Sequence, residues 1–384
     1  MKSSVSIVKV HSYNEEEVWI GLRKSIDLIG GIKNFVKNGD LVLLKPNLLY
    51  GKPPEKAVTT HPSIIRGIIQ IVREAGGIPF IGDSPSIGSL DRAAEKAGIK
   101  KVADETKCPL MEFNRPILSE KGKGRFFKQL EIDQKVLEAD VVINLPKWKT
   151  HGMMLLTLGV KNLFGCVPGP RKALWHLKAG EDQKIFAQVL VDLYQIVQPS
   201  LTILDGILGM EGNGPGSGDP IRLGLILASK DALSLDQVAC DLLGISRESL
   251  PTNRVALREG IASDPIEVVG ERVEDVRIPH FKFPPLSEPD WNLPRFIKRA
   301  LRGALTSKPI FEEGLCDSCD QCIGVCAPGA LAREGKELVF DYGTCIRCFC
   351  CQEVCPSGAI TIQPGWAQRL RRNSNPAKAG PNIK

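Results

Sequence analysis

The chain has 384 residues, 43% of them hydrophobic and 24% charged, which is the composition of an ordinary globular protein. No apolar run approaches the roughly 18 residues that a membrane-spanning helix needs, and Met1–Val10 lacks the continuous apolar core of a signal peptide, so we expect no transmembrane segment and no export. The 50 basic and 44 acidic residues are mixed along the chain, and the net charge of +6 disfavours an obligate nucleic-acid-binding protein.

Residues 1–290 alternate between strand and helix patterns. A strand is predicted at Val5–Val10, then a helix that Asn14 can cap together with Glu17. A buried strand at Leu41–Lys45 precedes a helix over Pro62–Ala75, which ends at two glycines. Further strands are predicted at Ile78–Ile81, Asp140–Leu145, Leu201–Asp205 and Leu223–Ala228, and a helix at Ala232–Leu243. This order predicts an α/β large domain with a mostly parallel sheet flanked by helices.

A proline-punctuated stretch, Ile278–Pro289, predicts a linker because it cannot continue a helix or a central strand. Residues 291–308 follow with a basic amphipathic helix, in which Trp291 and Phe296 share one face and Arg295 lies on the other. Such a helix either packs on the neighbouring domain, which we expect, or docks on a membrane surface. Residues 365–384 are basic, rich in Asn, Pro and Gly, and predicted to be disordered.

Eight of the twelve cysteines lie in the last fifth of the chain, in two runs of Cys-x-x-Cys-x-x-Cys-x-x-x-Cys that each precede a proline. This spacing is typical of bacterial modules with two [4Fe-4S] clusters, in which the fourth cysteine of each run binds the other cluster. We therefore assign one cluster to Cys316, Cys319, Cys322 and Cys355, and the other to Cys345, Cys348, Cys351 and Cys326. Zinc is the alternative, but zinc ribbons rarely carry three evenly spaced cysteines and a fourth before proline.

Residues 309–364 are thus predicted to form a small α+β ferredoxin-like domain that binds both clusters. Cysteines gathered at metal-ligand spacing, rather than spread as disulfides, indicate a reducing cytoplasm. Cys350 falls outside the spacing and is interpreted as a bystander, and Cys108, Cys166 and Cys240 as small buried hydrophobes.

The forty residues between Asp140 and Glu181 contain no acidic residue and many basic ones. They include Lys147, Lys149, His151, Lys161, Arg171, Lys172, His176 and Lys178. The segment Pro146–His151 is predicted to be a loop after a strand, where α/β proteins bind ligands. Gathered cations repel one another unless an anion offsets them, so we expect an anionic ligand; a basic face paired with acids elsewhere in the chain is the alternative.

Two aspartates follow predicted strands. Asp83 either caps a helix or faces a ligand. Asp205 is followed by several glycines up to Gly218, a stretch that either lets the backbone approach a ligand or is a plain flexible loop. It does not match the dinucleotide fingerprint G-x-G-x-x-G. His61 and His151 lie in polar stretches, and lysines beside a histidine disfavour its cation, which suits acid-base work.

Several of these segments together resemble the domain of unknown function family 362, over most of residues 1–290. They are Lys45-Pro-Asn47, Thr59–Pro62, Gly82–Pro85, Lys147-x-Lys149-x-His151, Lys161–Gly165 and Asp205–Gly212. Members of this family often carry a two-cluster ferredoxin module. The resemblance implies a recurring polar site on loops and an attached electron relay, without a settled reaction.

The leading hypothesis is a ferredoxin-linked oxidoreductase that reduces a small anionic substrate. The clusters would pass single electrons to this substrate, and a redox partner protein would exchange electrons with the clusters. His151 and Lys149 are the candidate catalytic residues. The candidate substrate-binding residues are Lys45, Asn47, His61, Asp83, Lys147, Lys161, Asn162, Arg171 and Asp205. The alternative is a non-catalytic electron-transfer subunit or adaptor whose basic face docks a partner. Cations that converge in a pocket favour a small ligand, and cations on a flat face favour a partner.

Overall fold

We describe the chain from a computed structural model. The described residues are 3–120, 122–169, 171–179, 182–284, 307–335 and 337–365. The predicted amphipathic helix within 291–308 and the predicted disordered tail therefore lie outside the described residues, apart from 307, 308 and 365. Within the part that is described, every helix is too short or too polar to cross a bilayer.

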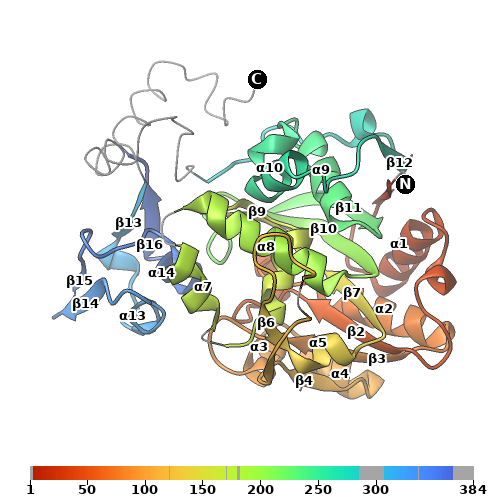
Figure 1. Cartoon of the computed structure of the whole chain (residues 1–384), viewed down its shortest axis with the longest axis horizontal. Coiled ribbons are helices and arrows are strands. Elements are labelled where there is room, and N and C mark those ends of the chain that lie inside the picture. The colour runs from red at the N-terminus through yellow and green to blue at the C-terminus, as the bar shows by residue number, and fades with distance from the viewer. Residues whose placement is uncertain are drawn as a thin grey trace.

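A ten-stranded sheet forms the centre of the large domain (Figure 1). Its main path runs β12 (Ile266–Gly270), β1 (Ser3–Lys9), β11 (Asp219–Ser229), β10 (Leu201–Glu211), β7 (Val141–Leu145), β2 (Leu41–Pro46), β3 (Ile78–Asp83) and β4 (Leu110–Glu112). Strands β10, β7, β2, β3 and β4 run parallel to one another, whereas β11 is antiparallel to both β10 and β1. The predicted α/β class with a mostly parallel sheet is confirmed.

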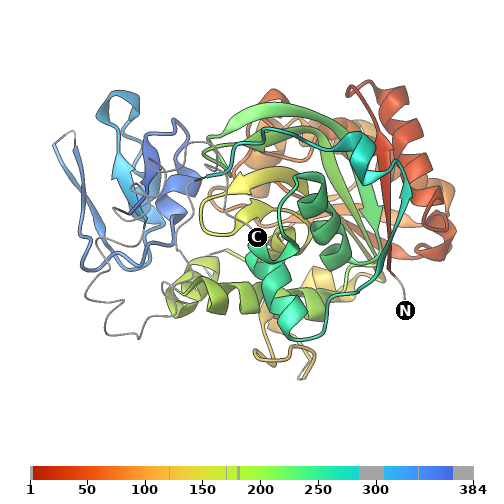
Figure 2. The same cartoon turned by 90° about the horizontal axis from the view of Figure 1, so that it is seen from above.

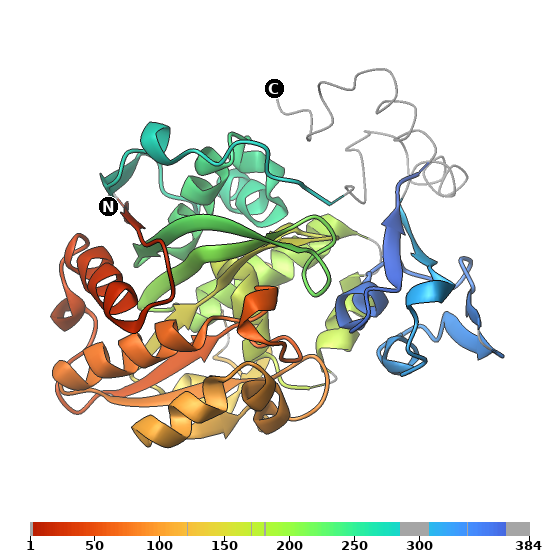
Figure 3. The ribbon, with the colours of Figure 1, turned by 180° about the vertical axis from the view of Figure 1, so that it is seen from behind.

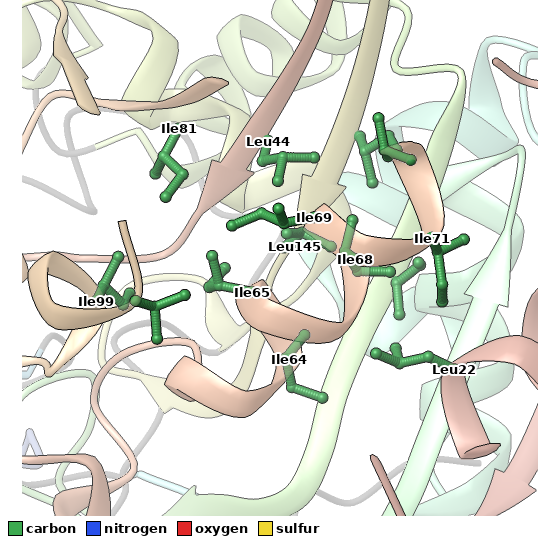
Figure 4. Packing of buried hydrophobic residues seen from close by; sticks show 14 of the residues in the cluster. Leu22, Leu44, Ile64, Ile65, Ile68, Ile69, Ile71, Ile81, Ile99 and Leu145 are labelled. Carbon is green, nitrogen blue, oxygen red and sulfur yellow. The ribbon is translucent and has the colours of Figure 1, made fainter. Parts of the chain in front are cut away.

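Helices cover both faces of this sheet, because successive side chains of a buried strand point to opposite sides. Leu44 of β2 belongs to a core with α1 (Glu15–Asp27), α2 (Pro62–Glu74) and α4 (Ile99–Thr106). Figure 4 shows the isoleucines of α2 lying over Leu44, Ile81 and Leu145. The preceding residue, Leu43, faces a second core with α8 (Gln183–Val197). A third core lies under α9 (Ala232–Leu242). The remaining helices of the large domain are α3 (Leu90–Lys96), α5 (Gln134–Glu138), α6 (Gly159–Asn162), α7 (Arg171–Ala179) and α10 (Pro251–Arg258).

Helix α1 begins as predicted, but only half of the expected cap forms. The Asn14 side chain accepts hydrogen bonds from the N–H groups of Glu16 and Glu17, at 3.0 and 3.3 Å. The Glu17 carboxylate does not return to Asn14; it accepts from the backbone N–H of His11 and the hydroxyl of Ser12, each at 2.5 Å. The chain before the helix therefore folds back onto its first turn.

Replacing Asn14 with alanine is expected to lower the free energy of unfolding by about 1 kcal/mol, because two N–H groups of α1 lose their acceptor. Urea unfolding followed by circular dichroism measures the change. Glu16→Gln is the matched control, since no hydrogen bond of the Glu16 carboxylate is recorded among the described residues. Equal stability of Asn14→Ala and the parent chain would contradict the capping role.

Two segments that we expected to be loops are strands. Residues 147–151 form β8, which pairs with β10 and with β9 (Leu155–Thr157), so the basic side chains belong to a strand that is paired on both sides. Strand β10 continues past Asp205 to Glu211, which places Gly206 and Gly209 inside it. A β-carbon on Gly209 would lie 3.1 Å from the carbonyl oxygen of Trp148. The glycines let β8 approach β10, which the one-dimensional pattern did not reveal.

The predicted linker begins packed rather than free. Ile278 and Phe281 are buried in the third core, and Gly212 donates a hydrogen bond to the carbonyl of Lys282 at 2.7 Å. Residues 278–284 therefore cover the large domain, because their apolar side chains have a core to join.

The described residues from 307 to 365, here called the C-terminal module, repeat one small unit twice. In the first copy β13 (Lys308–Phe311), α13 (Gln321–Gly324) and β14 (Leu331–Glu334) follow one another; in the second, β15 (Glu337–Phe340), α14 (Cys350–Val354) and β16 (Ile360–Gln363) do. Strand β13 pairs with β16, and β14 with β15. Figure 2 and Figure 3 show from two directions that this module packs beside the large domain.

Candidate functional site

A pocket of about 550 Å³ lies between the large domain and the C-terminal module. The large domain contributes the carboxyl ends of β2 and β3, together with residues of β8, α6 and α7. The module contributes Gly324, Val325, Cys350, Glu353 and Val354. Of the candidate site residues, the pocket wall includes Lys45, Asn47, Asp83, Lys149, His151, Lys161, Asn162 and Arg171. The position matches the expectation that ligands bind outside the carboxyl ends of parallel strands.

Lys45 and Asp83 form a buried ion pair inside this wall. The Lys45 Nζ lies 2.8 Å from Asp83 Oδ1, and both side chains are almost fully buried. Asp83 also accepts from the N–H groups of Leu48 and Ser84, and α3 is capped by Ser89 instead. Asp83 therefore neutralises Lys45 and fixes the backbone that follows β2 and β3. The sequence analysis had expected either a helix cap or a contact to a ligand.

Three candidate residues, His61, Lys147 and Asp205, gather away from the pocket. Lys147 Nζ lies 2.8 Å from Asp205 Oδ2 and 2.7 Å from the Tyr13 hydroxyl, which donates to Asp205 Oδ1 at 2.6 Å. The His61 ring stacks on Tyr13 with centroids 3.5 Å apart, and the backbone N–H of His61 donates to Asp205 Oδ2 at 2.9 Å. We call these four residues the Asp205 network. Tyr13 was missed because nothing in its local sequence marks it.

Lys149 heads a chain of hydrogen bonds that runs from the pocket into the sheet. Its Nζ donates to Asn47 Oδ1 at 2.8 Å and to the Val58 carbonyl at 2.7 Å. Asn47 then donates to Asn162 Oδ1, and Asn162 donates to Asn144 Oδ1, each at 2.8 Å. Burial, followed by the charge of Lys161, lowers the pKa of Lys149 to about 7. An ammonium with two neutral acceptors can therefore release or regain a proton near neutral pH.

His151 is oriented by its own turn. Its Nδ1 accepts from the N–H groups of Met153 and Met154, both at 3.1 Å, so the proton of the neutral ring is assigned to Nε2. Nε2 lies 2.8 Å from Glu353 Oε1 of the C-terminal module. Burial lowers the pKa of His151 although Glu353 opposes that shift. His151 thus faces the module as a neutral ring, and Glu353 is a pocket residue that the sequence analysis missed.

Lys161 and Lys172 complete the row of cations. Lys161 Nζ lies over the rings of Phe164 and Phe186, 5.3 and 5.6 Å from their centroids. Lys172 donates to the carbonyl of Ser84, and burial lowers its pKa to about 8. We had counted Lys172 in the basic stretch without assigning it a site, because only the packing of α7 brings it to the end of β3. Arg171, at the rim, lies 3.0 Å from Glu131.

The buried Lys149 makes stability depend on pH. Because its pKa of about 7 in the folded chain lies below the ordinary 10.5, the unfolded chain binds more protons between these values. Folding is therefore disfavoured by Lys149 below pH 7, and this cost fades as the pH rises. We expect the wild type to gain about 2 kcal/mol relative to Lys149→Met between pH 7 and pH 9.

Urea unfolding of both variants at the two pH values measures this difference. Lys230→Met, a change at an exposed lysine, is the control and should track the wild type at both values. A constant difference between wild type and Lys149→Met would contradict the lowered pKa.

The thiols of the two cysteine runs interact across the repeat. Burial raises the pKa of Cys322 to about 11, and the next contribution comes from Cys355 of the other run. Burial likewise raises the pKa of Cys345, with contributions from Cys348 and from Cys326 of the first run. Among the described residues, no three His, Cys, Asp or Glu side chains gather around a point that would hold a single metal ion. The fourth cysteine of each run thus lies near the opposite run.

The loops that carry the cysteines are equivalent. Ser318 and Asp320 in the first run and Arg347 and Phe349 in the second all have φ between 52° and 60°, a left-handed conformation. Backbone N–H groups point at sulfur in both loops: Ser318 donates to Cys316 and Arg347 to Cys345, each at 3.4 Å. The two runs therefore share the same loop conformation, with a backbone N–H turned toward the first sulfur of each run.

These features define an α/β protein whose lysine-rich pocket is closed by a cysteine-rich C-terminal module. The chain matches the family model "Domain of unknown function (DUF362)" over residues 42–241 and belongs to that family, which confirms the predicted resemblance over a narrower range. It is 39% identical over 305 residues to the "Thylakoid-associated protein sll1697" of Synechocystis sp., covering 79% of this chain and 94% of the relative.

The chain is also similar over part of its length to two solved structures. A protein from Thermotoga maritima gives a TM-score of 0.33 at 12% identity, covering 51% of each chain. The lactate racemase apoprotein from Thermoanaerobacterium thermosaccharolyticum gives 0.38 at 11% identity, covering 60% of this chain and 55% of its own.

Proposed function

We propose that the protein is an iron-sulfur electron-transfer protein of the cytoplasm, whose large domain binds a small anionic substrate for reduction. The observation that carries the proposal is the position of α14. This helix holds Cys351, a predicted cluster ligand, and also supplies Cys350, Glu353 and Val354 to the pocket wall. A ligand in the pocket would therefore lie beside the cysteine-rich module.

The cysteines fit two [4Fe-4S] clusters in the assignment made from spacing. Cys316, Cys319, Cys322 and Cys355 would hold one, and Cys345, Cys348, Cys351 and Cys326 the other. Support comes from the electrostatic proximity of Cys322 to Cys355 and of Cys345 to Cys326, and from the N–H groups aimed at sulfur, which are typical of cluster loops. When bound, such clusters supply one-electron transfer.

The remaining residues would bind the substrate and move protons. Lys161 and Lys172 would hold the anion, Asn47 and Asn162 would fix the position of Lys149, and Lys149 would deliver a proton. The convergence of lysines in a pocket favours a small ligand over the adaptor alternative, which needs a flat basic face. His151 is better suited to holding Glu353 than to donating a proton to a substrate, since its Nδ1 is engaged as an acceptor and its Nε2 faces the Glu353 carboxylate.

The test is anaerobic purification followed by iron and sulfide analysis, dithionite reduction, and removal of excess dithionite. The expected content is about eight iron and eight sulfide per chain. Reoxidation of the clusters is then followed by absorbance against pools of anionic metabolites, and one pool is expected to reoxidise the wild type.

Two variants separate the parts of the proposal. Cys351→Ser should lose iron, whereas Lys149→Ala should keep full iron but react slowly with the active pool. Zinc in place of iron would overturn the electron-transfer proposal. Full clusters that no pool reoxidises would overturn the reductase role and leave protein partners as the electron acceptors.

A further inference from the structure

We infer that the ligand of the pocket is an organic dianion, with two carboxylate or phosphate groups separated by an apolar body. This inference rests on the proposed function and specifies its substrate class. Three ammonium groups carry it: those of Lys149, Lys161 and Lys172. Among the described residues, none of them lies within ion-pair distance of a carboxylate; their neighbours are carbonyl or amide oxygens and aromatic rings.

The carboxylates of the pocket wall are already occupied. Asp83 is paired with Lys45, and Glu353 lies against His151. Glu112 accepts a hydrogen bond from the N–H of Leu90, at the start of α3. Within the described residues none of these three lysines is thus in an ion pair, although the charge of Glu353 favours the protonated forms of Lys149 and Lys161 from a longer distance. An anionic ligand would balance these buried or half-buried cations directly.

The cations stand at two places along the sheet edge. Lys149 is tied to Asn47, which follows β2, and Lys172 is tied to Ser84, which follows β3. Asn47 and Ser84 follow neighbouring strands, and we place one anionic group of the ligand near each of them. We place Lys161 with Lys149 at the end of β2, because among the charged groups Lys161 has the largest effect on the pKa of Lys149.

The size and lining of the pocket fit an organic body between these groups. A volume of about 550 Å³ is within the range of organic ligands and far exceeds that of a phosphate or sulfate ion. Phe113, Phe164, Val325 and Val354 line the same space. Apolar walls favour an organic ligand, whose carbon skeleton they can contact, over an inorganic anion, which would have to lose its hydration shell there.

The test is calorimetric titration of the anaerobic, cluster-loaded full chain with paired carboxylates of graded length, from butanoate and butanedioate upward, at constant ionic strength. At the best length, the dicarboxylate is expected to bind about tenfold more tightly than the monocarboxylate. Lys172→Met should remove this advantage, so that the dicarboxylate and the monocarboxylate bind the variant with the same affinity. Lys230→Met, a change at an exposed lysine, should keep the advantage. Circular dichroism and melting of each variant show that it is folded.

The outcomes distinguish the inference from the proposed function. If monocarboxylates and dicarboxylates of every length bind equally, the dianion inference is overturned while an anion-binding reductase stands. If Lys172→Met is folded and keeps the full advantage, the second anionic position is assigned wrongly and the inference also fails. If no carboxylate and no inorganic phosphate binds, both the inference and the anionic-substrate proposal are overturned.

Discussion

Replacing Asp205 with alanine is expected to lower the free energy of unfolding by about 3–5 kcal/mol, the usual cost of leaving a buried charge unpaired. Lys147 would lose its only carboxylate partner recorded in the described chain, at 2.8 Å, and both side chains are fully buried. Tyr13 and the N–H of His61 would lose their acceptor as well. Burial already lowers the pKa of Lys147 and Asp205 opposes this shift, so the pKa of Lys147 should fall further in the variant.

Denaturant unfolding of single and double variants tests this expectation. Lys147→Met combined with Asp205→Leu removes both charges and should recover part of the loss, because no charge is left unpaired. Tyr13→Phe should cost less than Asp205→Ala, since the ion pair remains. A loss below about 1 kcal/mol for Asp205→Ala would show that water or relaxation replaces the carboxylate, and the network would then not be a main source of stability.

Replacing Lys161 with methionine is expected to weaken binding of the pocket anion by about 10- to 150-fold, which corresponds to a charged hydrogen bond of about 1.5–3 kcal/mol. Methionine keeps an unbranched apolar stem against Phe164 and Phe186, so packing is retained while the charge is lost. The measurement is the concentration of anion that gives half-maximal reoxidation of the reduced clusters.

A change of opposite sign provides the matched comparison. Glu353→Gln removes a buried carboxylate of the pocket wall whose negative charge acts on Lys161 and repels a bound anion, so the anion should bind several-fold more tightly. Glutamine keeps an acceptor at the position that faces His151 Nε2, which preserves the contact with the module. Both variants must retain full iron content. Equal anion affinity in the Lys161→Met variant and the wild type would remove Lys161 from the site.

The local sequence pattern predicted a strand or helix correctly where burial of apolar side chains alone decides which of the two forms. Apolar runs such as Leu41–Leu44 form buried strands, and the isoleucine-rich Pro62–Glu74 forms an amphipathic helix, because burial of these side chains outweighs other local preferences. Strand β8 was missed because its polar residues read as a loop. Its partners β9 and β10 and the glycines that admit it are distant in sequence or weak as local signals.

The sequence by itself determined the α/β order, the two cysteine runs and the unusual gathering of basic residues between Asp140 and Glu181. It did not determine which cations stay available. Lys45 and Lys147 are neutralised by Asp83 and Asp205, which lie far away in the chain, whereas Lys161 and Lys172 are not paired with any described carboxylate. Electrostatic balance depends on distances of a few ångströms, and only the packing of strands, helices and the C-terminal module decides those distances.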